Sequence, residues 1–551
     1  MTNFTQLSQD AASNFLQSIV FIDDKAYQSN DTSDQHDFNA KEITKVFSEN
    51  GKVCAVYEPS TTQEIDSLIT VAKKADVAVI DWQIVIDDQR ETEEEESDDE
   101  ADADIDDVRG IYTKKIINQL LLDESCKNSI KLILVYTGET DLEQIAIDIH
   151  QSINDNNLEG FNIDSNDSCT IVSKSCRIMV IAKSNREEES GQHAYLLRSK
   201  RVTYAELPVF ITQQFSSLTS GLLSNFAMAS LSEVRRNFNQ ILSQFSKKLD
   251  AAYLAHQSLL PNTHDANELL IELLGSTFMS TLRYKGLNQY INNDLIEAWL
   301  MENVPERQFH LKKSNGDNET ITFSLSHNKL MRLLGSHDVV ETKYREVIKD
   351  GEDNGQLTNK RLDLLASKFA ITLFTDDSNY NEINHKFANL CQHRNIITND
   401  SYTPSLTLGT VVKSTTENNY YICIQQRCDS VRLNEDNTRR FLFLSLTEVT
   451  DSQDVKTFDF LTPTGTKLKV NKGTYALRTV KFNGSSTGTV PSELISTQRL
   501  FYPTHHSENI PEAFQFIVEL KEMYAQKIIE EYSGSLSRVG LDEPEWVRRY
   551  N

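Results

Sequence analysis

Three aspartates stand at the ends of two short apolar runs near the start of the sequence. Asp23 and Asp24 follow the run SIVFI, and Asp81 follows the run VAVI. If these runs are neighbouring parallel strands, their carboxyl ends lie together and the three carboxylates converge. Like-charge repulsion makes such a cluster costly unless a cation is bound, and Mg²⁺ prefers oxygen ligands of this kind. The metal would bridge the Asp81 carboxylate and an incoming phosphoryl group, so that Asp81 accepts phosphate.

Two further side chains fit the same chemistry. Thr137 follows the run KLILVY and offers a hydroxyl to a phosphoryl oxygen, while Gly138 beside it leaves room for the group to enter. Lys183 follows the run RIMVIA and supplies a cation to pair with the acceptor and then with the phosphate. Any single carboxylate at a strand end is more often a turn former or a helix N-cap. Five residues of suitable type at the ends of four predicted strands nevertheless favour a phosphoacceptor site with Asp81 as the acceptor.

The elements that must position these side chains follow from the periodicity of the first two hundred residues. Short β-rich apolar runs alternate there with helical patterns, which is typical of a parallel α/β sheet. The apolar runs cover residues 18–22, 53–57, 77–80, 130–136 and 176–181, and the helical patterns cover residues 40–48, 63–72, 112–122 and 141–153. We therefore expect a flavodoxin-like domain over residues 1–200 with a five-stranded parallel sheet, whose ligands bind at the carboxyl ends of the strands.

Two segments interrupt this alternation. Residues 87–108 are dominated by acidic side chains, which predicts a disordered and solvated insertion in the loop that follows Asp81. Residues 155–175 form an extra excursion before the last strand, where a hairpin would fit.

The remainder of the chain is predicted to be helical over residues 201–400. An apolar stripe over residues 218–253 fits one long helix, or two helices end to end. It could be a dimerisation helix that links two copies of the chain, or a buried helix in an ordinary helical domain. Further helical patterns cover residues 266–282, 293–301, 328–348 and 360–373.

The periodicity changes to two near residue 401. Residues 401–505 are predicted to form a small antiparallel β-rich barrel or sandwich. Its expected strands cover residues 420–425, 440–446, 467–471 and 474–482. Residues 506–551 are expected to form a C-terminal helix, opened by Pro511, and a tail.

The composition disfavours several kinds of partner. The chain of 551 residues has a formal net charge of −26 and no Lys/Arg-rich run, so nucleic acid is disfavoured. Its first residues lack a signal-peptide pattern, and no apolar stretch approaches the roughly 18 residues that a membrane span needs. The seven cysteines are scattered and lack zinc-knuckle spacing, as expected for reduced thiols. We expect a cytoplasmic protein with neither nucleic acid nor membrane as a partner.

The set of Asp23 with Asp24, Asp81, Thr137 and Lys183 resembles the receiver domains of two-component response regulators. The resemblance implies transient phosphorylation of Asp81 by a partner histidine kinase, and Mg²⁺ held by the aspartates and by the backbone carbonyl of Gln83. It covers the first two hundred residues.

Three departures from the receiver pattern concern the output face of the domain. Val180 stands where receivers often carry an aromatic switch residue, and Ser184 rather than a proline follows Lys183. The loop after Asp81 is enlarged by the acidic insertion. These departures put the usual output switch in doubt more than the phosphorylation itself.

A divergent receiver with a long extension that ends in SRVGLDEPEW resembles the receiver proteins of bacterial conflict systems, in particular those of the Detocs phage-defence system. The resemblance implies a stoichiometric phosphoacceptor that acts as a phosphate sink, beside a second receiver protein fused to an effector enzyme. Two alternatives stay open. The receiver could gate an unrecognised enzymatic or toxic activity in the C-terminal half, or it could be a pseudo-receiver scaffold that is never phosphorylated.

Overall fold

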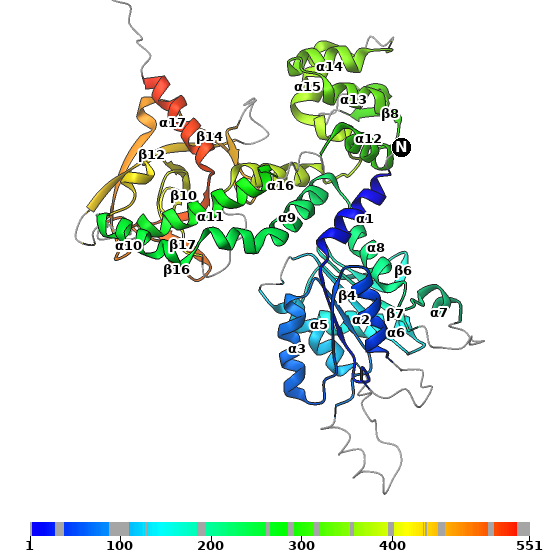
Figure 1. Cartoon of the computed structure of the whole chain (residues 1–551). Coiled ribbons are helices and arrows are strands. Elements are labelled where there is room, and N and C mark those ends of the chain that lie inside the picture. Colours follow the sequence, from blue (N-terminus) through cyan, green and yellow to red (C-terminus); the bar gives the residue numbers. More distant parts are fainter. Residues whose placement is uncertain are drawn as a thin grey trace, which may run out of the picture. The chain divides into compact units, whose positions relative to one another are not determined.

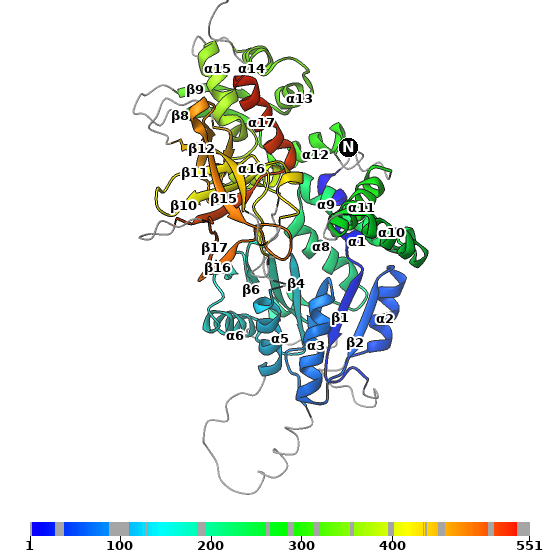
Figure 2. The same cartoon turned by 90° about the vertical axis from the view of Figure 1, so that its left-hand side faces the viewer.

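The structure is a computed structural model that divides into two compact units (Figure 1 and Figure 2). Unit 1 comprises Met1–Gln244 and Thr277–Pro305, and unit 2 comprises Phe245–Ser276 and Glu306–Asn551. Each unit is described by itself. The structure describes residues 3–27, 38–86, 110–124, 126, 129–183, 194–260, 265–284, 291–312, 320–352, 357–394, 402–433, 435, 438–449, 458–504 and 512–536. The predicted disordered insertion lies outside these residues, as do Ser184, Pro511 and the terminal SRVGLDEPEW segment.

Unit 1 is built on a seven-stranded sheet with the strand order β2-β1-β3-β4-β7-β6-β5. Its parallel strands are β1 (Ser18–Ile22), β2 (Val53–Tyr57), β3 (Val77–Ile80), β4 (Lys131–Thr137) and β7 (Cys176–Ala182). These five strands lie where the sequence predicts them, and their order is that of a flavodoxin-like sheet.

A hairpin of β5 (Asn162–Asp164) and β6 (Asp167–Val172) extends the sheet beyond β7. Strand β6 pairs with β7 in the antiparallel direction. The hairpin occupies the predicted excursion, but the expectation of a sheet with five strands is wrong. The open edge of β7 offers unpaired backbone groups, and the excursion satisfies them instead of turning away into solvent.

Helices cover both faces of this sheet because successive residues of a buried strand point to opposite sides. In β1, Val20 and Ile22 face one core, whereas Ile19 and Phe21 face the other. The helices packed on the first core are α3 (Thr62–Lys74), α5 (Ile111–Leu122) and α6 (Leu142–Asp155). The helices that contribute to the second core are α1 (Phe4–Phe15), α2 (Ala40–Glu49), α8 (Leu207–Thr219) and α9 (Leu222–Gln244). Helix α1 is not among the predicted elements.

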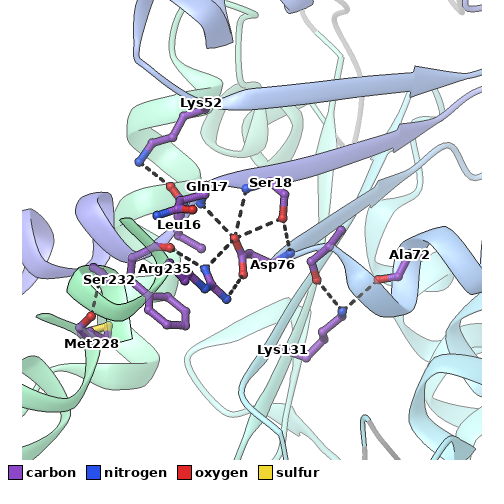
Figure 3. A network of polar contacts seen from close by, with 12 residues as sticks. Leu16, Gln17, Ser18, Lys52, Ala72, Asp76, Lys131, Met228, Ser232 and Arg235 are labelled. Carbon is purple, nitrogen blue, oxygen red and sulfur yellow. Dashed lines mark hydrogen bonds and ion pairs between the residues drawn. The ribbon is translucent and has the colours of Figure 1, made fainter. Parts of the chain in front are cut away.

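A polar network at the amino ends of β1 and β3 joins α9 to the sheet (Figure 3). One carboxylate oxygen of Asp76 accepts hydrogen bonds from the backbone amides of Gln17 and Ser18, at 2.9 and 3.0 Å. The other oxygen pairs with the Arg235 guanidinium of α9 at 2.9 Å. Arg235 also donates a hydrogen bond to the Phe15 carbonyl, at 2.9 Å. The network therefore ties α1 and α9 to the amino ends of the strands, whereas the predicted site lies at their carboxyl ends.

The apolar stripe predicted over residues 218–253 is broken in the structure. After the last residues of α8, the chain forms α9, the short 3-10 helix η1 (Lys247–Leu249) and α10 (Asp250–Leu259), rather than one long helix. Ser246 begins η1 by accepting a hydrogen bond from a backbone amide, and Ser220 lies between α8 and α9. The buried residues of α9 include Met228 and Ala229, whereas Phe238 of the predicted stripe is 52% exposed. One long helix is therefore wrong, and the alternative of two helices end to end fits α9 and α10. The stripe is not the buried face of α9, and dimerisation through this segment stays a prediction.

The other helices of the region predicted to be helical are α7 (Ala194–Lys200), α11 (Asp265–Tyr284), α12 (Asn293–Asn303), α13 (His327–Gly335), α14 (Val340–Lys349), α15 (Asn359–Leu364) and α16 (Tyr380–Gln392). The segment predicted as a helix over residues 328–348 is divided into α13 and α14. Helix α15 continues into the π-helix η3 (Leu365–Phe369) and the 3-10 helix η4 (Ala370–Leu373). No helix in the part of the chain that the structure describes is long and apolar enough to cross a membrane.

The same region contains an unpredicted antiparallel hairpin of β8 (Arg307–Lys312) and β9 (Thr320–Leu325). The hairpin presents Phe309 and Phe323 to the interior, with ring centroids 4.9 Å apart. The expectation of an entirely helical region is therefore wrong, because alternate residues of these strands bury aromatic side chains on one face.

The C-terminal part of unit 2 is a nine-stranded antiparallel sheet. The sequence predicts an antiparallel β-rich domain there, although with fewer strands. Its strands are β10 (Thr410–Ser414), β11 (Tyr420–Cys423), β12 (Thr438–Glu448), β13 (Phe460–Leu461), β14 (Lys467–Val470), β15 (Leu477–Asn483), β16 (Glu493–Ile495), β17 (Gln498–Phe501) and β18 (Phe514–Glu519). Two cores lie on opposite faces of the sheet: Val412 belongs to one, and its neighbour Val411 to the other.

The end of the chain departs from the predicted helix. Strand β18 lies between β10 and β17, so residues that the sequence assigned to a helix opened by Pro511 form an inner strand. The observed helix α17 (Glu522–Leu536) begins only after this strand and contributes Ile528 and Tyr532 to the second core. A short apolar run such as FQFIV does not distinguish a buried strand from a helix by periodicity, which explains the error.

Candidate functional site

The three aspartates meet at the carboxyl ends of β1 and β3. These strands are adjacent and parallel, and the Asp81 amide donates a hydrogen bond to the Ile22 carbonyl at 2.8 Å. Carboxylate oxygens from Asp23, Asp24 and Asp81 lie within 4.8 Å of one another, and the three residues are only 2–4% exposed. The fold thus concentrates three acids in one buried place, as the sequence pattern indicates.

Lys183 reaches into this cluster from the end of β7. Its backbone amide donates to the Thr137 carbonyl at 2.8 Å, which fixes the start of its side chain beside β4. Its ammonium group lies 2.6 Å from Asp23 Oδ2 and 3.2 Å from Asp81 Oδ1. The same group lies 5.5 Å from the centre of the Phe38 ring. A buried cation therefore bridges two of the three acids, and an aromatic face lies close to it.

The electrostatics of the cluster follow from burial. Burial raises the pKa of Asp24 to about 6, with a further contribution from the Asp23 carboxylate, while the Val85 amide acts in the opposite direction. Burial also raises the pKa of Asp81; the Lys183 ammonium opposes this shift, and the two neighbouring carboxylates add to it. The pKa of Lys183 is raised by Asp81 and Asp23 against the effect of its own burial. With three acids ionised and one ammonium, the formal charge is −2.

The cluster suits a divalent cation. Two positive charges would balance the formal charge of the ionised groups, and all the candidate ligands are the oxygens that Mg²⁺ prefers. Asp81 Oδ1 is buried and forms an ion pair with Lys183, but it accepts no well-aligned hydrogen bond. This oxygen therefore has lone pairs that could bind a further cation. This is the only group of three or more His, Cys, Asp or Glu ligands at such spacing among the residues described.

Thr137 and Gln83 are the two other residues that the sequence predicts at this site. Thr137 is fully buried at the end of β4, and its hydroxyl accepts a hydrogen bond from the Glu139 amide at 3.1 Å. Gln83 lies two residues after Asp81 in the irregular segment that follows β3. The functional roles predicted for these two residues stay predictions.

The segment that follows Asp81 is held by contacts that the sequence does not reveal. The Val85 amide donates to Asp24 Oδ2 at 3.1 Å. From α5, the hydroxyl of Thr113 donates to the Asp81 carbonyl at 2.5 Å and lies 3.2 Å from the Trp82 carbonyl. A threonine inside a helical pattern carries no special signal, since such a residue usually bonds within its own helix or points to solvent.

The structure shows which side chains lie near position 180, where the sequence departs from the receiver pattern. Val180 is buried in the core that lies under α3, α5 and α6, where its side chain fills space as an ordinary strand residue does. Tyr136 of β4 instead packs edge-on against Tyr204, whose ring in turn packs against Phe38. The aromatic side chains near the site therefore come from β4 and from segments outside the strands, not from position 180.

Comparison with known families identifies the class of this domain. Residues 15–188 match the family model described as Response receiver domain. Together with the sheet order and the buried acids, this match supports a receiver domain in the N-terminal part of the chain, of the response-regulator kind used in two-component signalling. The match covers less than half of the chain, and no curated protein or solved structure matches it significantly.

Proposed function

We propose that this protein is a phosphoacceptor that takes a phosphoryl group on Asp81 from a partner histidine kinase. The observation that carries the proposal is the cluster of Asp23, Asp24 and Asp81 around the buried ammonium of Lys183. Buried acids are normally avoided, so a cluster of three held by one cation favours a functional role over a purely structural one.

In the proposed reaction an Asp81 carboxylate oxygen attacks the phosphorus of the donor. An O–P bond forms to Asp81 as the bond between phosphorus and the donor nitrogen breaks, and the imidazole leaves with the electron pair. Lys183 lies 3.2 Å from Asp81 Oδ1, near enough to balance the negative charge of the phosphorylated product. The Thr137 hydroxyl, at the end of the neighbouring strand, would donate a hydrogen bond to a phosphoryl oxygen.

The cofactor proposed for this site is Mg²⁺. Asp23, Asp24 and Asp81 would hold it, with the backbone carbonyl of Gln83 as a further ligand. When bound, the ion would supply positive charge that keeps the acids ionised and offsets the charge of the phosphoryl oxygens. The chain's own contribution is to bury the acids and to fix Asp81 beside Lys183.

The further role proposed is that of a phosphate sink in a bacterial anti-phage relay. The support is the receiver match at residues 15–188 and the resemblance of the chain's layout to the receiver proteins of the Detocs system. A partner histidine kinase and a second receiver fused to an effector would be its counterparts. Phosphorylation of this chain would then draw phosphate away from the effector.

Acetyl phosphate and Mg²⁺ provide the test, read by intact mass. The wild type is expected to gain one phosphate, and Asp81→Asn none, because the amide cannot form the acyl phosphate. Asp81→Asn also removes a like charge from the cluster, so it should fold at least as well as the wild type. Asp66→Asn is the matched control, because Asp66 is a largely exposed aspartate of the same domain that pairs with Lys115.

Phosphate gain that survives Asp81→Asn would refute the assignment of the acceptor. A wild type that gains no phosphate from acetyl phosphate or from a cognate kinase would leave the scaffold alternative in place. The sink role is tested separately: with kinase and effector receiver together, added wild type should lower effector phosphorylation, and Asp81→Asn should not.

A further inference from the structure

The backbone that carries Asp81 is joined to α5 through residues 87–109, and the structure describes both flanks of that segment. A short connection would by itself restrict where a helix can lie relative to the strand before it. A connection of this length restricts it weakly, since the entropy of loop closure changes slowly with length. The packing of α5 on the core, together with contacts between the flanking residues, must therefore set the position of α5 against the end of β3.

Thr113 makes the contact between the first turn of α5 and the backbone at Asp81. Its side chain is fully buried, and its hydroxyl donates to the Asp81 carbonyl at 2.5 Å with the Trp82 carbonyl 3.2 Å away. These two carbonyls belong to consecutive peptide groups. A donor placed between them fixes the orientation of both, and thereby the direction in which the Asp81 side chain leaves the backbone and the path of the chain into Gln83.

Gly110, at the start of α5, strengthens this placement. Its φ of +79° is in the left-handed region, and a Cβ there would lie 2.3 Å from the Trp82 ring. The first turn of α5 therefore packs directly against the side chain of the residue after Asp81. The close approach brings Thr113, one turn further on, within reach of the Asp81 and Trp82 carbonyls.

We propose that Thr113 is a positioning residue for phosphoryl acceptance, which acts by holding the peptide groups on either side of Trp82. The inference rests on the proposed function of Asp81. A purely structural role predicts that loss of the hydroxyl lowers stability alone. A positioning role predicts in addition that it slows phosphorylation and weakens Mg²⁺ binding, because Asp81 and the Gln83 carbonyl are displaced.

The test compares Thr113→Val, which removes the donor at similar volume, with Thr113→Ser, which keeps it. Three quantities are measured on the full chain: the rate of phosphate gain from acetyl phosphate, the Mg²⁺ affinity by calorimetry and the melting temperature. Thr113→Val should be phosphorylated on the order of ten- to a hundredfold more slowly and bind Mg²⁺ more weakly, and Thr113→Ser should restore both.

Thr44→Val is the matched control. The Thr44 hydroxyl donates to the Ala40 carbonyl within α2 at 2.6 Å, so its loss should change stability without changing the phosphorylation rate or Mg²⁺ affinity. If Thr113→Val does not fold, Thr113→Cys is measured instead. A thiol is a weaker hydrogen-bond donor than a hydroxyl, so Thr113→Cys should be phosphorylated more slowly than Thr113→Ser.

Three results separate the positioning role of Thr113 from the proposed function of Asp81. A wild type that takes phosphate, together with Thr113→Val of equal rate and equal Mg²⁺ affinity, overturns the positioning role alone. The same holds if Thr113→Ser is as slow as Thr113→Val. A wild type that takes no phosphate overturns the proposed function itself.

Discussion

Arg235→Ala should loosen α9 from the receiver sheet. Arg235 donates to both carboxylate oxygens of Asp76, at 2.9 and 3.3 Å, and to the Phe15 carbonyl at 2.9 Å. Its guanidinium also lies 4.5 Å from the centre of the Phe15 ring. The Asp76 side chain is 8% exposed and that of Arg235 31%, so the pair is shielded on one side and open to water on the other. The substitution removes all of these contacts at once.

The magnitude follows from this geometry. Hydrogen bonds to a charged group contribute about 1.5–3 kcal/mol when buried, and partial exposure of Arg235 places the loss near the lower end, at about 2 kcal/mol. Asp76 keeps the amides of Gln17 and Ser18 as donors, which limits the penalty of leaving its charge unpaired. A loss of about 2 kcal/mol in the free energy of local opening raises amide exchange roughly 30-fold.

Hydrogen exchange of the full chain, read by mass spectrometry on peptides from α9, measures this opening directly. Arg236→Ala is the matched control, because Arg236 is the next residue of the helix and half exposed. It pairs with Glu233 of its own helix and bonds Asn14, and its removal should cost less than about 1 kcal/mol. If Arg235→Ala speeds exchange of α9 no more than Arg236→Ala does, the network of Figure 3 does not anchor α9.

Two further predictions concern the receiver. Gly110→Ala should lower the free energy of unfolding by about 2–4 kcal/mol, through left-handed strain and overlap with Trp82, as read by chemical denaturation. Gly51→Ala, at φ +68° with open space around its Cβ, should cost only about 1 kcal/mol, and equal losses would contradict the packing argument. Because the pKa of Asp24 is raised to about 6, from about 3.9 unfolded, stability of the metal-free protein should fall as pH rises from about 4 to 6, by about 3 kcal/mol. The rise in melting temperature that Mg²⁺ produces should therefore be larger at about pH 7.5 than at about pH 5, and an equal rise at both would contradict this account.

The parallel part of the receiver sheet was predictable because its strands are short, mainly apolar and separated by amphipathic helices. The inner strands β1, β3 and β4 are buried on both faces, so their composition marks them. The residues at their carboxyl ends then converge by topology, which is why Asp23, Asp81 and Lys183 could be brought together from the sequence.

The elements that escaped prediction owe their form to tertiary contacts. The sequence of β18 is a short apolar run, which fits a strand or the start of a helix. Its pairing with β10 and β17 makes it a strand. The hairpin of β5 and β6 was expected over residues 155–175, but its addition to the sheet was not, because that depends on pairing with the open edge of β7. The stripe over residues 218–253 had helical spacing, but its serine-containing breaks divide it.

The contacts that complete the site were also beyond the sequence. Thr113 lies far from Asp81 along the chain, across the acidic insertion, and nothing in its local pattern indicates that its hydroxyl turns toward β3. Phe38 reaches Lys183 in the same way, from a segment before α2. Periodicity identifies which faces are buried, but it does not identify which buried polar group bonds which carbonyl.

The chemical identity of the phosphorylated residue tests the central claim most directly. Phosphorylated protein is reduced with borohydride, which converts an aspartyl phosphate to homoserine, and its peptides are mapped by mass spectrometry. The account predicts homoserine at position 81, with Asp23 and Asp24 unmodified. Homoserine at another aspartate, or phosphate retained on a histidine, would contradict it.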